Sequence, residues 1–176
     1  MKRRNVTIAA LALVLVMGGL ALVPAADAAK LKAKIYVTQR PVPAAKTEQA
    51  LLAFARSNFT LRLRESNEKK LDDRKWKGDM IVSFNHGVGD TEFQVLFYDT
   101  HEGPRRFIED MAVFVSRRDE KTFVSKFSLG RPEFKPNHQH ELVVTVRREE
   151  VGRQKFATLG EEKRRSGFVG FSDDER

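Results

Sequence analysis

The chain has 176 residues, no cysteine and a formal net charge of +8 at pH 7, from 32 lysines and arginines against 24 aspartates and glutamates. The lack of cysteine excludes disulfides, thiol nucleophiles, thiolate metal ligands and a lipid anchor on an N-terminal cysteine. Mixed charge with 41% hydrophobic residues is typical of one ordinary globular domain that buries its own core.

The N-terminus has the three parts of a secretory signal peptide. Residues Lys2–Arg4 are positive, Val6–Val23 form an uncharged and mostly apolar run, and Ala26 and Ala28 supply a small-x-small exit. This pattern predicts a signal peptide over residues 1–28, with cleavage between Ala28 and Ala29. The chain is therefore expected to be exported, to the periplasm or outside the cell.

An uncleaved membrane anchor is the alternative for the same segment. The apolar run is near the lower limit of the roughly 20 residues that cross a bilayer as a helix. The small-residue exit has no purpose in an anchor, so cleavage is favoured and no transmembrane segment is expected afterwards.

The segment 29–75 mixes strand and helix signals. Residues 31–38 alternate polar and apolar, which predicts a strand, and residues 46–56 are rich in helix formers with Thr47 as a candidate N-cap. Residues 59–64 alternate again and predict a second strand, followed by a polar loop or a frayed helical turn over 66–75.

The segment 76–160 is predicted to be almost entirely β. Short alternating runs follow one another at near-regular spacing, with turns at 87–90, at 100–104 and, as a hairpin, at 117–120. Gly152 is expected to turn the chain so that residues 155–158 return beside the strand at 142–146. This rhythm predicts a mainly β sandwich or barrel, followed by a basic and then acidic tail over 161–176 with a possible last strand near 168–171.

One stretch resembles the start of strand F in fibronectin type III and related immunoglobulin-like domains. Phe134 and Pro136 occupy the apolar and proline positions of that pattern, and Leu142 and Val144 its inward positions, while His140 stands where the family has tyrosine. The resemblance implies an immunoglobulin-like antiparallel β-sandwich with one short N-terminal helix. It implies no particular activity, because this fold carries many functions.

Histidines provide a metal hypothesis. His138 and His140 lie two residues apart, a spacing that puts both on one face of a strand. His140 is in phase with apolar residues, so a structural role is favoured, and a metal site needs a third ligand such as His86 or His101. No metal or other cofactor is therefore assigned from the sequence. The loop Asp99–Glu102 is noted as polar, in a position where binding groups often collect.

Other chemistry has weaker signals. No nucleophile or acid–base pair is recognisable, so an enzyme is not expected. The basic charges are interspersed with acidic ones, as in Arg62, Arg64 and Glu65, and only Lys163–Arg165 is a pure cluster. Interspersed charge indicates a solvated surface, although an anionic polymer remains a candidate partner; nucleic acid is not expected. The lone Trp76 is expected in the core.

The sequence thus favours an exported, non-enzymatic β-sandwich that acts as a binding or structural module of the bacterial envelope. Its partner would be an unidentified envelope protein or an anionic polymer. The alternatives are a polyanion- or polysaccharide-binding module with a basic surface and a small periplasmic metal-binding protein that uses His138 and His140. The role of the helix near 46–56, whether cap or docking surface, and the oligomeric state stay open.

Overall fold

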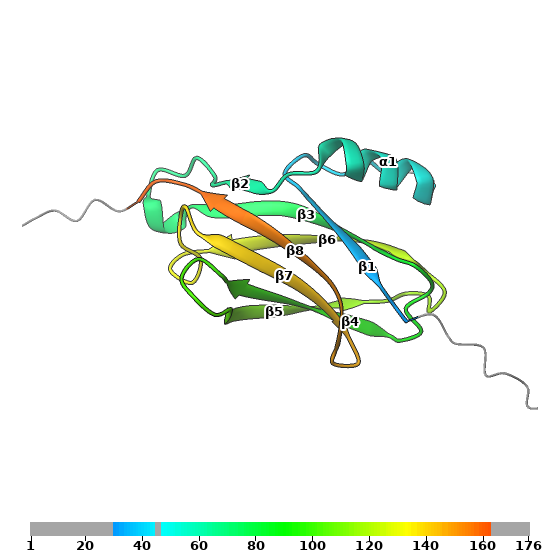
Figure 1. Ribbon diagram of the computed structural model, residues 1–176. Helices are drawn as coiled ribbons and strands as arrows, with labels where there is room; N and C mark the ends of the chain where they lie inside the picture. The colour runs from blue at the N-terminus through cyan, green and yellow to red at the C-terminus, as the bar shows by residue number, and fades with distance from the viewer. Residues whose placement is uncertain (1–29, 45–46, 163–176) are drawn as a thin grey trace, which may run out of the picture.

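A computed structural model describes residues 30–44 and 47–162 (Figure 1). The predicted signal peptide, its cleavage point at Ala28 and Ala29, and the possible last strand near 168–171 lie outside the described residues. Within them no helix is both long enough and apolar enough to cross a membrane.

The described residues form two facing β-sheets. The three-stranded sheet has the order β1-β3-β6 and the five-stranded sheet the order β2-β8-β7-β4-β5. The strand bounds are β1 (Ala33–Thr38), β2 (Arg62–Arg64), β3 (Lys75–Phe84), β4 (Glu92–Asp99), β5 (Arg106–Phe114), β6 (Thr122–Gly130), β7 (Gln139–Val146) and β8 (Glu149–Leu159). The helical elements are α1 (Glu48–Asn58) and a short 3₁₀ helix, η1 (Leu71–Asp73).

This strand order is that of an immunoglobulin-like sandwich. With β2 set aside, the sheet β1-β3-β6 corresponds to strands A-B-E of that fold. The facing sheet β8-β7-β4-β5 corresponds to strands G-F-C-C′. All pairings are antiparallel except that of β2, a short strand at the sheet edge parallel to β8. The predicted fold class is therefore confirmed.

The core lies between the two sheets and is rich in phenylalanine. Phe84, Phe93 and Phe123 form a triangle of edge-to-face contacts with ring centroids 5.3–5.9 Å apart. Trp76 is fully buried, as predicted, and its indole N–H donates to the Leu159 carbonyl at 3.0 Å. Burial of large aromatic side chains thus replaces the disulfide that this cysteine-free sandwich lacks.

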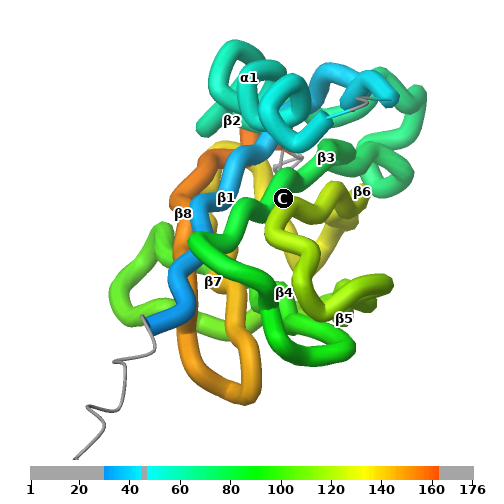
Figure 2. Tube along the Cα trace, turned by 90° about the vertical axis from the view of Figure 1, so that its right-hand side faces the viewer, coloured from blue at the N-terminus to red at the C-terminus, as the bar shows by residue number. Residues whose placement is uncertain are grey.

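Helix α1 covers the outer face of the three-stranded sheet (Figures 1 and 2). It begins at Glu48, two residues later than predicted, because the Thr47 hydroxyl caps it by accepting the Ala50 N–H at 3.2 Å. Ile81 points outward from β3, yet it and Ala55 of the helix are fully buried. The helix therefore shields an apolar sheet face rather than an open end of the sandwich.

Three expectations about local structure were wrong. The predicted strand over 59–64 is shorter in the structure, where β2 covers only Arg62–Arg64. Phe59 and Leu61 precede β2 and are 39% and 47% exposed. The segment 117–120 is not a hairpin turn: it connects β5 in one sheet to β6 in the other. Gly152 lies inside β8 and does not turn the chain.

The real β7–β8 turn is Arg147-Arg148, whose φ angles of 51° and 69° match the left-handed geometry of a two-residue hairpin. Turns of this type usually contain Asn or Gly, so the pair Arg147-Arg148 could not be recognised as a turn in the sequence. Gly152 is instead required by close packing: a Cβ there would lie 2.5 Å from the Ala33 carbonyl oxygen of β1.

The connection between β6 and β7 is fixed by a chain of two hydrogen bonds. The Thr158 hydroxyl on β8 donates to the Lys135 carbonyl at 2.6 Å and accepts from His140 Nε2 at 3.2 Å. Because the hydroxyl proton is used on Lys135, His140 must carry its own proton on Nε2. In immunoglobulin-like domains a tyrosine hydroxyl makes the equivalent bond to the upstream backbone. Here a histidine and a threonine share that task.

His140 is fully buried against Phe134 and Phe156. Burial lowers the pKa of His140 from 6.5 to about 4, and the nearby Asp99 carboxylate only partly opposes this. The folded chain therefore holds His140 neutral at every pH above about 4, whereas the unfolded chain protonates it below about 6.5.

We predict that this buried histidine makes the domain acid-sensitive. Between pH 6.5 and pH 5 the unfolded state takes up a proton at His140 and the folded state does not, so the free energy of unfolding should fall by about 1.5 kcal/mol on this account. His140→Tyr should remove that part of the pH dependence. Urea unfolding at the two pH values, with EDTA present, measures the difference, and identical pH dependence in both proteins would contradict the assignment.

Candidate metal centre

The candidate site lies at the end of the sandwich that carries the β4–β5 and β6–β7 connections, on the left in Figure 1. The strand register builds it, because Asp99 of β4 is paired directly with His140 of β7. His101 and Glu102 follow Asp99, and His138 precedes His140. The two polar segments, 37 residues apart from His101 to His138, are thus forced to meet.

His101, Glu102 and His138 each offer one ligand atom, and these atoms lie within 4.8 Å of one another. The imidazole rings of His101 and His138 are stacked, with centroids 4.1 Å apart and planes at 25°. His138 is half-buried, whereas His101 and Glu102 are exposed on the β4–β5 loop. The site therefore has one fixed ligand and two that solvent can reach.

Asp99 orients the fixed ligand. Asp99 is buried, with 8% of the residue exposed. Its carboxylate lies 3.3 Å from His138 Nδ1 and also accepts the His101 backbone N–H at 2.9 Å. Burial alone would raise the pKa of Asp99, but these hydrogen bonds hold it below its usual value. An ionised Asp99 makes Nδ1 of His138 the donor and leaves Nε2 as a lone pair, as in carboxylate–histidine–metal sites.

The remaining histidines lie elsewhere. The structure does not bring His140 into the group: its ring is 6.3 Å from that of His138, and its Nε2 is engaged by Thr158. His86 lies in the β3–β4 connection at the opposite end of the sandwich. Of the two third ligands suggested by the sequence, His101 is the one that reaches His138. Glu102 was visible only as a polar loop residue.

The donor set fits a divalent transition metal. Two imidazoles and one carboxylate suit Zn²⁺, Cu²⁺ and Ni²⁺, and they leave a coordination position open to solvent. Donors around a tetrahedral Zn²⁺ at 2.0–2.2 Å lie roughly 3.3 Å from one another. The distances between the three ligand atoms must therefore shorten by up to about 1.5 Å when an ion binds. The exposed loop side chains of His101 and Glu102 can make this movement.

A concavity of about 400 Å³ adjoins the site. His138 lines it, together with the bases Arg131 and Lys135 and the apolar rings of Pro132, Phe134 and Pro136. Asp72 and Glu162 lie at the same concavity. A metal ion at His138 would thus face a surface of mixed charge and apolar walls.

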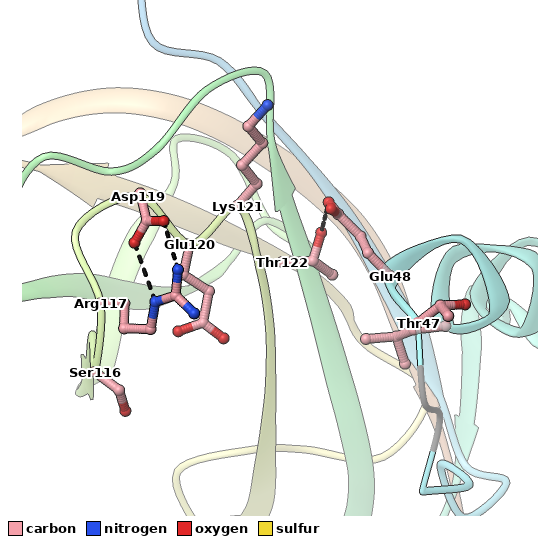
Figure 3. Close-up of a pocket in the computed structure, with 9 residues that line it drawn as sticks. Thr47, Glu48, Ser116, Arg117, Asp119, Glu120, Lys121 and Thr122 are labelled. Atoms are coloured by element: carbon pink, nitrogen blue, oxygen red, sulfur yellow. Dashed lines mark hydrogen bonds and ion pairs between the residues drawn. The ribbon is translucent and has the colours of Figure 1, made fainter.

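A larger concavity of about 550 Å³ lies between the start of α1 and the β5–β6 connection (Figure 3). Three of its charged groups have partners: Arg117 contacts Asp119 at 2.7 Å, and Glu48 accepts a hydrogen bond from the Thr122 hydroxyl at 2.6 Å. No histidine lines it. Size alone therefore does not make it the functional site.

Comparison with known proteins shows no family for this chain. No family model and no curated protein matches the sequence. A solved structure described as an immunoglobulin-like protein from Pseudomonas aeruginosa is similar at 16% identity, over 74% of this chain and 97% of that chain, with a TM-score of 0.37. The fold assignment rests on the strand order described above.

Proposed function

We propose that this chain is an exported, non-enzymatic immunoglobulin-like module of the bacterial envelope that binds a divalent transition-metal ion through His101, Glu102 and His138. The observation that carries the proposal is the convergence of these three side chains, with Asp99 behind His138. A carboxylate that accepts a hydrogen bond from the other ring nitrogen of a metal-binding histidine is a regular feature of such sites.

The form of the site favours reversible binding. Three protein ligands, two of them exposed, would leave the ion accessible to water and to competing chelators. A buried four-ligand site would instead serve to stabilise the fold. The role we propose is therefore to hold or pass on a metal ion outside the cytoplasm.

Export is supported by the sequence of residues 1–28, with its positive start, apolar run and Ala26-x-Ala28 exit. The absence of cysteine suits a metal site in an oxidising compartment, since imidazole and carboxylate ligands do not form disulfides.

We predict that Zn²⁺ raises the thermal midpoint of the purified protein, because an ion that binds only the folded state stabilises it by about 2.7 kcal/mol at one hundred times its Kd. His101→Gln and His138→Gln should each remove most of this shift. Differential scanning fluorimetry with Zn²⁺, Cu²⁺ and Ni²⁺ against EDTA measures it.

His86→Gln is the matched control, since it removes a histidine at the other end of the sandwich. It should leave the metal-induced shift unchanged. A wild-type midpoint that none of the three ions moves, or equal losses in all three variants, would overturn the metal-binding function.

Export has its own test. The intact mass of the protein recovered from the envelope fraction of a bacterial host should correspond to a chain that begins at Ala29. Recovery of the full 176-residue mass from the membrane fraction would show instead that the apolar run stays as an anchor.

A further inference from the structure

Three arginines line a third concavity, which is remote in sequence from the histidine site. It has a volume of about 310 Å³ and lies between the end of α1 and strand β2. Arg40 follows β1, whereas Arg62 and Arg64 come from β2. The other lining residues are Thr38, Gln39, Ser57, Asn58, Phe59 and Thr60.

The acidic neighbour in the sequence does not neutralise this cluster. Because side chains alternate along β2, Arg62 and Arg64 project to one side and Leu63 to the other. The next residue, Glu65, contacts Arg131 at 2.6 Å and Arg74 at 3.0 Å. The charges that looked interspersed in the sequence are therefore separated in space.

No carboxylate lines the concavity. Within residues 30–44 and 47–162, the guanidinium groups of Arg62 and Arg64 have no hydrogen bond or ion pair, and that of Arg40 donates only to Asn58 Oδ1 at 2.9 Å. Three like charges that face one hollow repel one another, and a bound anion would relieve this repulsion. Guanidinium groups are also the side chains best suited to bidentate bonds with phosphate or carboxylate.

The backbone that carries these arginines is held in place by polar side chains. Gln39 accepts the Arg64 backbone N–H at 2.8 Å and donates to the Arg64 carbonyl at 2.7 Å. The Thr60 hydroxyl likewise accepts the Arg62 backbone N–H at 3.2 Å. These bonds use the polar groups of Gln39 and Thr60 to hold the backbone of Arg62 and Arg64, and they leave the two guanidinium groups available for a ligand.

Phe59 adds an apolar wall. Its ring packs edge-to-face on Tyr36 with centroids 6.1 Å apart and remains 39% exposed. An aromatic face beside charged donors suits a ring that is apolar on one side and carries anionic and hydroxyl groups at its edge, which describes a charged pyranose.

We propose that the concavity formed by Arg40, Arg62, Arg64 and Phe59 binds an anionic sugar, a pyranose that carries phosphate or carboxylate. This site shares none of its residues with the metal centre, so either can fail without the other. The proposed site also assigns a binding role to three of the basic residues of the chain.

The test uses isothermal titration calorimetry of the purified protein with glucose 6-phosphate, glucuronate, glucose and inorganic phosphate, at low ionic strength and with EDTA present. Glucose 6-phosphate or glucuronate should bind, more tightly than inorganic phosphate, and glucose should not. The double variant Arg62→Gln/Arg64→Gln should weaken binding at least about tenfold, because it removes two charge-assisted contacts.

The matched control is Arg117→Gln/Arg153→Gln, which removes two exposed arginines that contact Asp119 and Glu150 elsewhere on the surface. It should leave the affinity unchanged, and all variants should keep the wild-type thermal midpoint. The proposal is overturned if no charged sugar binds, if inorganic phosphate binds as tightly as the sugars, or if the control weakens binding as much as the β2 variant.

Discussion

The pairing of β4 with β7 is the constraint on which the candidate site depends. It sets Asp99 opposite His140, and Thr158 fixes the chain before β7 by bonding to both His140 and the Lys135 carbonyl. A shift of one residue would turn His140 out of the core and carry His138 away from Asp99. The buried corner and the proposed metal ligands are therefore consequences of one register.

The two proposed sites use charge in different ways. At the histidine end, Asp99 is paired with basic groups and serves to orient a ligand. On the α1 side, Arg62 and Arg64 are left without acidic partners because Glu65 is engaged by Arg74 and Arg131. A formal charge of +8 says nothing about this division, since net charge reports solubility and general attraction rather than sites.

Much of the fold could be predicted from local patterns. Alternating runs marked most strands, Thr47 marked the helix start, and Phe134 to Val144 indicated the sandwich. What failed depended on contacts between distant segments. The contact between His101 and His138 requires the β4–β7 register. The two partners of Glu65, Arg74 and Arg131, lie just before β3 and just after β6. Gly152 is required by its packing against Ala33 rather than by a turn.

The coordination of a bound ion tests the central claim most directly. Extended X-ray absorption fine structure of the protein loaded with one equivalent of Zn²⁺ should show two imidazole ligands at about 2.0–2.1 Å and oxygen at about 2.0–2.2 Å. His101→Gln should reduce the imidazole count to one. A zinc spectrum with oxygen ligands alone, or one that His101→Gln leaves unchanged, would contradict the metal centre described by His101, Glu102 and His138.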